Sequence, residues 1–313
     1  MTDNLNPYCP KRFLTLDAVL KKQFGEKVVK IPLNARLTCP NRDGFKGRGG
    51  CIYCSERLSG EFGGDPADSF EQQFEKTRKL YYNKWGQTLY IPYLQAGTNT
   101  YAPLERLRKI YDCALSLPGA VGLSIATRAD CISDGIAELL AEFSKKTYLT
   151  VELGLQSSND ETAERINRCH SFSDFLDGYR TLKDRNIRTC IHIINGLPGE
   201  NRSDMLKTAA DVAALEPYEV KIHLLHIIKN TPAEKLWQSG GIRPLERDEY
   251  IGIVCDQLEI MSPTTAIGRL TGDGDRKTLL APLWSRDKRS VLNGIDKELA
   301  RRGSIQGMRY SKV

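Results

Sequence analysis

The chain has 313 residues and a mass of 35.2 kDa, with 27% charged residues and a mean hydropathy of −0.41. These values favour a globular protein, and the sequence contains no apolar stretch of bilayer length, which excludes a membrane-spanning protein. The net charge of +6 is concentrated after Pro263. This basic end favours a polyanionic partner such as nucleic acid, although a solvated helix face has the same pattern.

Short apolar runs that favour strands alternate along the chain with helical segments. Residues 69–85 and 103–117 have helical patterns, and Pro103 suits the first turn of the second segment. Strand runs separated by helices indicate right-handed crossovers and a parallel sheet. We expect strands at residues 27–34, 88–95, 120–127, 148–156, 187–196 and 219–228.

This order of elements predicts an α/β fold, a partial (β/α)6 barrel formed by residues 27–240. Residues 1–26 would form an N-terminal extension, and residues 241–313 a basic C-terminal extension of mixed structure that closes or flanks the barrel. In parallel barrels, chemistry gathers at the carboxyl ends of the strands. Polar or glycine-rich stretches follow the expected strands at residues 37–60, 96–101, 128–131, 156–160, 196–201 and 229–232.

The first of these stretches contains three cysteines, Cys39, Cys51 and Cys54. Thiolates in proteins hold either zinc or an iron–sulfur cluster. A structural zinc would need a fourth ligand from a distant residue such as Cys9 or His170. A four-iron cluster held by three thiolates would instead leave one iron open to a chelating molecule such as S-adenosylmethionine, which supplies an amine and a carboxylate together. The chain starts without a signal peptide, so we expect a cytoplasmic protein, in which disulfides are rare.

Five stretches carry a resemblance to radical SAM enzymes, and in particular to the YtqA/YhcC group of bacterial proteins. The long gap after the first cysteine also resembles the catalytic subunit of Elongator. The resemblance implies that Cys39, Cys51 and Cys54 hold a 4Fe–4S cluster, that S-adenosylmethionine binds to it, and that a flavodoxin or ferredoxin supplies electrons. The stretches that carry the resemblance are residues 30–62, 95–104, 151–170, 194–200 and 268–285.

The same resemblance implies roles around the S-adenosylmethionine. Tyr53 would lie against the adenine. Gly97, Thr98 and Asn99 occupy the position of a Gly-Gly-Glu motif that holds the methionyl amine, but this chain lacks the acid. The resemblance further implies that Arg168 pairs with the methionyl carboxylate.

Two further groups of residues complete the expected cofactor site. Glu152 and Gln156 stand four apart on a strand and therefore share a face, and the resemblance implies that they bind the ribose hydroxyls. The turn formed by Gly196, Leu197 and Pro198 would bring backbone amides near the adenine.

His226 and Lys229 are the candidates for residues on the substrate side. His223 and His226 differ by three positions, so at most one of them would reach the barrel mouth from a regular strand. Cys169, beside Arg168, is a further residue with a possible function. For each histidine, a core position with satisfied hydrogen bonds is an open alternative.

The Elongator-like core, the basic cysteine loop and the basic carboxyl end suggest tRNA as the partner. An anticodon base is already unpaired and can enter a deep cavity. The resemblance implies conversion of a carboxymethylaminomethyl group at C5 of a wobble uridine to an aminomethyl group. Two alternatives remain open: a radical SAM enzyme for a small metabolite or a peptide, and a zinc-bearing RNA-binding protein without catalysis.

Overall fold

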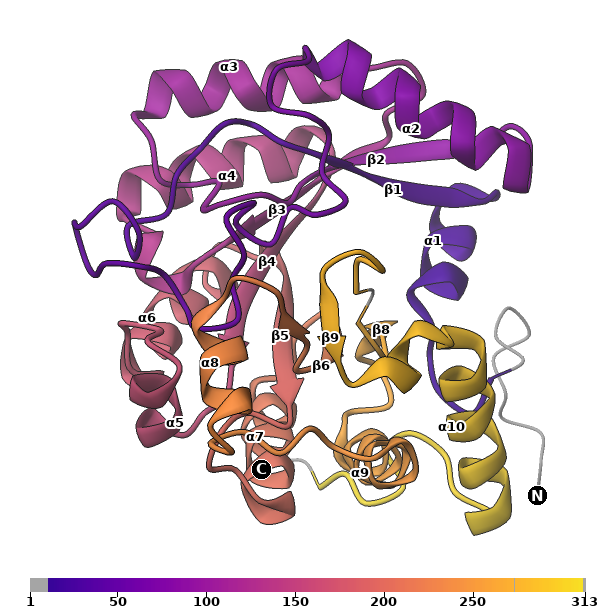
Figure 1. The fold of residues 1–313 in the computed structure, drawn as a ribbon. Helices are drawn as coiled ribbons and strands as arrows, with labels where there is room; N and C mark the ends of the chain where they lie inside the picture. The colour runs from indigo at the N-terminus through magenta and orange to yellow at the C-terminus, as the bar shows by residue number, and fades with distance from the viewer. Residues whose placement is uncertain (1–10, 273, 312–313) are drawn as a thin grey trace.

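Within residues 11–272 and 274–311, which the computed structural model describes, seven parallel strands form one sheet that curls into a partial barrel (Figure 1). Neighbours in the sheet follow the order β1-β2-β3-β4-β5-β6-β8. Because every crossover moves in one direction, the sheet winds around an axis, and the expected α/β partial barrel is confirmed. The strands are β1 (Val28–Leu33), β2 (Leu89–Leu94), β3 (Gly122–Thr127), β4 (Tyr148–Gln156), β5 (Arg188–Asn195), β6 (Glu219–Leu224) and β8 (Ala266–Arg269).

The helices that follow the strands cover the outer face of the sheet (Figure 1). Capping boxes at Ser69, Ser171 and Asn201 start three of them, because each side chain accepts a hydrogen bond from the first turn. No helix among the described residues combines the length and the apolar character needed to cross a membrane. The helices are α1 (Leu16–Phe24), α2 (Phe70–Trp85), α3 (Leu104–Leu115), α4 (Asp134–Lys146), α5 (Asp160–Arg165), α6 (Phe172–Lys183), α7 (Arg202–Leu215), α8 (Pro232–Gln238), α9 (Arg247–Ile260) and α10 (Lys288–Arg302), with 3-10 turns η1 (Ala129–Cys131) and η2 (Leu283–Arg286).

The two faces of the sheet differ in chemistry. On the outer face, Ile125, Val151 and Ile191 are fully buried against the helices and belong to the main apolar core. On the inner face, the alternate positions carry polar side chains, such as Glu152 and Lys221, which lie at the cavity inside the barrel. Strand alternation therefore separates a hydrophobic core outside the sheet from a polar interior.

The C-terminal extension joins the barrel. Strand β8 pairs in parallel with β6, and β9 (Leu279–Ala281) pairs antiparallel with β7 (Ile227–Ile228). The segment before α1 also lies at this edge, since Ile267 of β8 donates a backbone hydrogen bond to the carbonyl of Leu14, at 2.7 Å. Residues 266–269 thus add a strand to the sheet, and residues 279–281 pair with the segment that follows β6, while the domain limits drawn from the sequence stay a prediction.

Gly178 lets α6 pack closely against η1. A Cβ added there would lie 2.2 Å from the carbonyl oxygen of Ala129, which is backbone and has no room to yield. We expect Gly178→Ala to destabilise the protein by about 1–3 kcal/mol, as overpacking does. Urea unfolding of the reconstituted protein under anaerobic conditions measures this effect.

Gly135→Ala is the matched control, because Gly135 lies in the first turns of α4 and its added Cβ would meet only Leu104, at 3.4 Å. Alanine favours a helix over glycine by up to about 1 kcal/mol, so this variant should be neutral or more stable. Equal unfolding midpoints for the two variants would contradict the packing argument.

Candidate active site

A cavity of about 320 Å³ opens at the carboxyl ends of the strands. One wall is the cysteine loop, with Cys39, Cys51 and Cys54, and the opposite wall consists of inward side chains of the sheet, including Glu152 and His192. The polar stretches that follow the strands in sequence therefore do gather around one site, and all three cysteines line it.

The loop after β2 fixes the cysteine loop through a close backbone approach. Gly97 has a φ of 76°, and a Cβ on it would lie 2.3 Å from the carbonyl oxygen of Leu37. Its amide donates to the carbonyl of Leu58, at 3.2 Å, and the amide of Thr98 donates to that of Thr38, at 3.0 Å. Only glycine combines this conformation with this contact.

Thr98 and Asn99 are buried, and their expected roles at the methionyl amine stay a prediction. Thr98 lines the cavity together with Gly97. The side-chain amide of Asn99 instead donates to the carbonyls of Leu94, Ala96 and Ala126, at 3.1, 3.2 and 2.9 Å. These bonds join the ends of β2 and β3, so Asn99 braces the wall behind the cavity.

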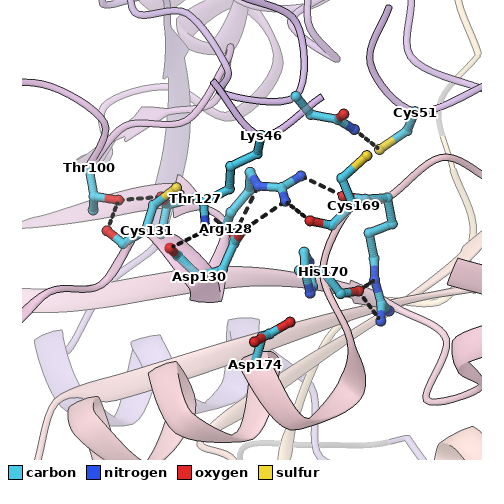
Figure 2. A network of polar contacts seen from close by, with 12 residues as sticks. Lys46, Cys51, Thr100, Thr127, Arg128, Asp130, Cys131, Cys169, His170 and Asp174 are labelled. Atoms are coloured by element: carbon cyan, nitrogen blue, oxygen red, sulfur yellow. Dashed lines mark hydrogen bonds and ion pairs between the residues drawn. The ribbon is translucent and has the colours of Figure 1, made fainter. Parts of the chain in front are cut away.

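An ion-pair network, buried at Arg128 and Asp130 and reaching the surface at Lys46, holds the cysteine loop to the loops after β3 and β4 (Figure 2). The guanidinium of Arg128 makes a two-point contact with Asp130, with both distances 2.9 Å, and Nη1 also donates to the carbonyl of Arg168, at 2.9 Å. From the cysteine loop, Lys46 Nζ lies 2.8 Å from the same carboxylate. Burial raises the pKa of Asp130, but Arg128 and Lys46 outweigh it and lower the pKa below its usual value.

Arg168 is 1% exposed and lines the cavity. Its Nη1 donates to the carbonyls of Leu155 and Ser157, and its Nε and Nη2 donate to that of His170, at 3.1 and 3.0 Å. The guanidinium thus clamps the backbone after β4. Its pairing with a methionyl carboxylate stays a prediction, and these backbone contacts supply a structural role that the sequence did not indicate.

The remaining residues expected at the cofactor lie in two places. Tyr53 and Gln156 line the cavity, and burial raises the pKa of Tyr53 well above its usual value. The turn Gly196–Pro198 does not appear in the cavity wall; Leu197 packs with Ile52 in a small apolar cluster, against which Tyr53 also packs. The expected approach of the turn's backbone amides to the adenine stays a prediction.

Glu152 lies at the floor of the cavity in a charged network. Lys30 Nζ donates to it at 2.6 Å, Lys221 donates to its other oxygen, and His192 Nε2 lies 2.7 Å away. Burial alone would raise the pKa of Glu152, but Lys221, Lys30 and His192 lower it well below its usual value. Both carboxylate oxygens have protein partners, and the expected bonds to ribose stay a prediction.

Both His223 and His226 line the cavity. Strand β6 ends at Leu224, and the chain resumes as strand only at Ile227, so the alternation of a regular strand does not apply across these residues. The single long strand expected at 219–228 is thus divided in two. Lys229 is exposed and outside the cavity wall, with its amide donating to the carbonyl of Thr278 at 2.9 Å.

The donor set suits a cluster held by three thiolates. Among the described residues, Cys39, Cys51 and Cys54 are the cysteines that line the cavity, whereas Cys131 and Cys169 lie outside its wall. Burial raises the pKa of Cys54 to about 11 and also raises that of Cys51, so their thiolates need a bound metal charge for stability. Of the distant residues that could complete a zinc site, Cys9 lies outside the described residues and His170 lines the cavity wall.

Comparison with known proteins identifies the family. The model of the radical SAM superfamily matches residues 44–212, and that of the radical SAM C-terminal domain matches residues 217–301. The chain belongs to the radical SAM superfamily. It therefore has the 4Fe–4S cluster and S-adenosylmethionine of that family as cofactors, as expected from the sequence.

Individual relatives show which radical SAM proteins the chain is similar to. The chain is 45% identical to the uncharacterized protein YtqA of Bacillus subtilis, over 100% of this chain and 98% of that one. It is 33% identical to YhcC of Escherichia coli K12, over 92% of each chain. A tRNA uridine(34) acetyltransferase of Methanocaldococcus infernus is 29% identical over 54% of this chain and 32% of its own length.

The fold also matches a solved structure of archaeal Elp3 from Methanocaldococcus infernus, which lacks its first 46 residues. The TM-score is 0.66 and the identity 19%, over 89% of this chain. The chain spans 64% of that structure, so the comparison supports the shared fold and leaves the rest of that protein without a counterpart here.

We expect Arg128→Ala to weaken both the fold and the cysteine loop. It would leave Asp130 buried without its two-point partner, and breaking a buried pair in this way costs about 3–5 kcal/mol. The free energy of unfolding, measured in urea, should fall. The iron and sulfide content per chain after anaerobic reconstitution should fall as well.

Arg108→Ala is the control, since Arg108 makes a similar two-point contact with Glu142 on the exposed surface of the protein, with side-chain exposures of 45% and 38%. Exposed pairs contribute about 0–1 kcal/mol, so stability and iron content should stay near those of the parent protein. An Arg128→Ala protein with full iron and unchanged stability would refute the bracing role of the network.

Proposed function

We propose that this radical SAM enzyme modifies tRNA at a wobble uridine, converting a carboxymethylaminomethyl group at C5 to an aminomethyl group. The observation that carries the proposal is the similarity to a tRNA uridine(34) acetyltransferase, which spans 54% of this chain. The match to the Elp3 fold is consistent with the same proposal. Resemblance to the YtqA group supports the particular side chain.

The rim of the cavity has the chemistry that an RNA loop requires. Phe62 lines the cavity and is 49% exposed, so an unpaired base has an aromatic face to stack on. Four basic residues in or next to the cysteine loop (residues 37–60) are exposed and can contact phosphates: Arg36, Lys46, Arg48 and Arg57.

The reaction divides into a radical half and a hydrolytic half. When bound, the cluster and S-adenosylmethionine supply hydrogen-atom abstraction by a 5′-deoxyadenosyl radical. The substrate would lose hydrogen from the carbon between its amine and carboxylate, then one electron to an acceptor of the flavodoxin or ferredoxin class and the N–H proton, which gives an imine. Water would then release glyoxylate and leave the aminomethyl group on the uridine.

The residues of the chain contribute to this reaction by position. The cavity floor contains Lys221 and Arg269, cations that can attract the substrate carboxylate.

The test is anaerobic turnover with S-adenosylmethionine, a reductant, a one-electron acceptor and tRNA that carries the carboxymethylaminomethyl group. We expect 5′-deoxyadenosine and glyoxylate in equal amounts, and a nucleoside whose carboxymethyl group is replaced by hydrogen, detected by mass spectrometry. Deoxyadenosine that forms equally fast without RNA, with no changed nucleoside, would overturn the tRNA proposal and favour a small substrate.

Phe62 provides a second measurement. Phe62→Ala should raise the KM for tRNA by about tenfold or more, because stacking of a base on an aromatic ring contributes about 1–3 kcal/mol. Phe62→Tyr keeps the aromatic face and should retain the parent KM. Equal KM values for the alanine and tyrosine variants would show that no base stacks there.

A further inference from the structure

A line of three side chains crosses the inner face of the sheet from β4 to β6. Glu152 Oε2 lies 2.7 Å from His192 Nε2, and His192 Nδ1 lies 3.3 Å from His223 Nε2. The two imidazole rings stack with their centroids 5.1 Å apart. All three residues line the cavity, and His223 stands closest along the line to the carboxyl ends of the strands.

The hydrogen bonds fix which nitrogen carries each proton. Glu152 is ionised and accepts only, so His192 must donate from Nε2, which leaves its Nδ1 as an acceptor. His223 must then donate from Nε2 to this Nδ1. In neutral His223 the lone pair is therefore on Nδ1, which accepts no hydrogen bond from residues 11–272 and 274–311.

The surroundings keep both imidazoles neutral. Burial lowers the pKa of His192 despite Glu152, and burial with the neighbouring charges lowers that of His223 well below its usual value. The groups that face His223 are His192 of β5, Lys221 of its own strand, Arg269 of β8 and His226. A neutral imidazole beside cations is a base that gives up its proton readily after accepting it.

A metal ion is a poorer explanation of this cluster. Ligand atoms of Glu152, Cys190 and His192 lie within 4.8 Å of one another, as a metal site would require. However, the ammonium groups of Lys30 and Lys221 already contact both oxygens of Glu152. A cation placed there would meet two positive charges, and burial raises the pKa of Cys190 well above its usual value.

We propose that His223 is the acid–base residue of the hydrolytic half of the reaction, and that Glu152 and His192 position it by fixing its tautomer. This inference rests on the proposed function. His223 Nδ1 takes a proton from water as the water oxygen bonds to the imine carbon, and it returns the proton to the nitrogen, which receives the C=N π electrons. It next takes the hydroxyl proton of the carbinolamine and delivers it to the nitrogen as the C–N bond breaks, which releases glyoxylate and the aminomethyl product.

The test separates the two halves of the reaction in a single turnover of the reconstituted enzyme with modified tRNA. His223→Gln keeps an N–H that can donate to His192 but has no basic nitrogen. We expect 5′-deoxyadenosine to form within about twofold of the parent rate, and glyoxylate release to slow by about 100-fold, the usual contribution of general acid–base catalysis.

Two readouts distinguish catalysis from a structural role. Quenching with borodeuteride should reduce the accumulated imine to the starting nucleoside with one deuterium added. In His223→Ala, added imidazole should restore glyoxylate release without changing the deoxyadenosine rate. His192→Gln retains His223 but removes the imidazole that fixes its tautomer, and it should slow glyoxylate release by about tenfold. This variant tests the proposed contacts between Glu152, His192 and His223 if a His223 variant loses iron.

The outcomes are distinct. Glyoxylate that keeps pace with deoxyadenosine in His223→Gln would overturn the proposal for His223 while leaving the proposed function intact. Loss of deoxyadenosine in variants with full iron content and normal tRNA binding would also overturn it, because His223 would then act before hydrolysis. A parent enzyme that releases no glyoxylate from tRNA would refute the proposed function itself, and the role of His223 with it.

Discussion

The site depends on the restraint of a loop that has no regular structure of its own. Three thiols must share one cavity wall, and the cysteine loop has no helix or strand among its described residues to place them. The restraint comes from the loops that follow the neighbouring strands. Gly97, in the loop after β2, approaches the backbone of the cysteine loop. Asp130, after β3, pairs with Lys46 of the cysteine loop, and Arg128 joins Asp130 to the loop after β4. Since the carboxyl ends of parallel strands are adjacent, these contacts reach one loop from several strands at once.

The polar barrel interior is the second feature that supports function. Charged side chains inside a protein are costly unless they are paired, and Glu152 is paired by Lys30, Lys221 and His192. Lys30 comes from β1 and also lies 3.3 Å from Glu219 of β6, so the curl of the sheet brings distant strands together. The interior is thus a polar environment fixed in advance, which suits chemistry that forms and discharges polar intermediates.

The sequence predicted the elements that local pattern specifies and missed those that depend on contacts across the fold. Apolar runs placed the six expected strands, and polar stretches after them placed the cavity. Strand β8 has four residues, too few for a clear alternation, and its place in the sheet depends on an edge supplied by β6. The break at Leu225 and His226 likewise depends on pairing of β7 with β9.

The candidate site shows the same limit. The three cysteines came from spacing and family resemblance, whereas the backbone contacts of Arg168 and the brace formed by Asn99 could be seen only in three dimensions. In the sequence, His192 alternates with apolar residues of the expected fifth strand, and nothing there places it beside Glu152. The feature that could have identified it is a polar side chain at an inward position of the strand. Recognising that position requires the register of the strand in the sheet.

The backbone contacts between residues 12–14 and the C-terminal part of the chain have a consequence for biosynthesis. Leu14 accepts a hydrogen bond from Ile267, and the backbone amide of Gln306 donates to the carbonyl of Arg12, at 2.9 Å. The segment around Leu14 is therefore completed by residues that are translated much later. Until those residues are made, β6 remains an open edge, so the protein environment of the iron centre is finished only after Gln306 has been translated.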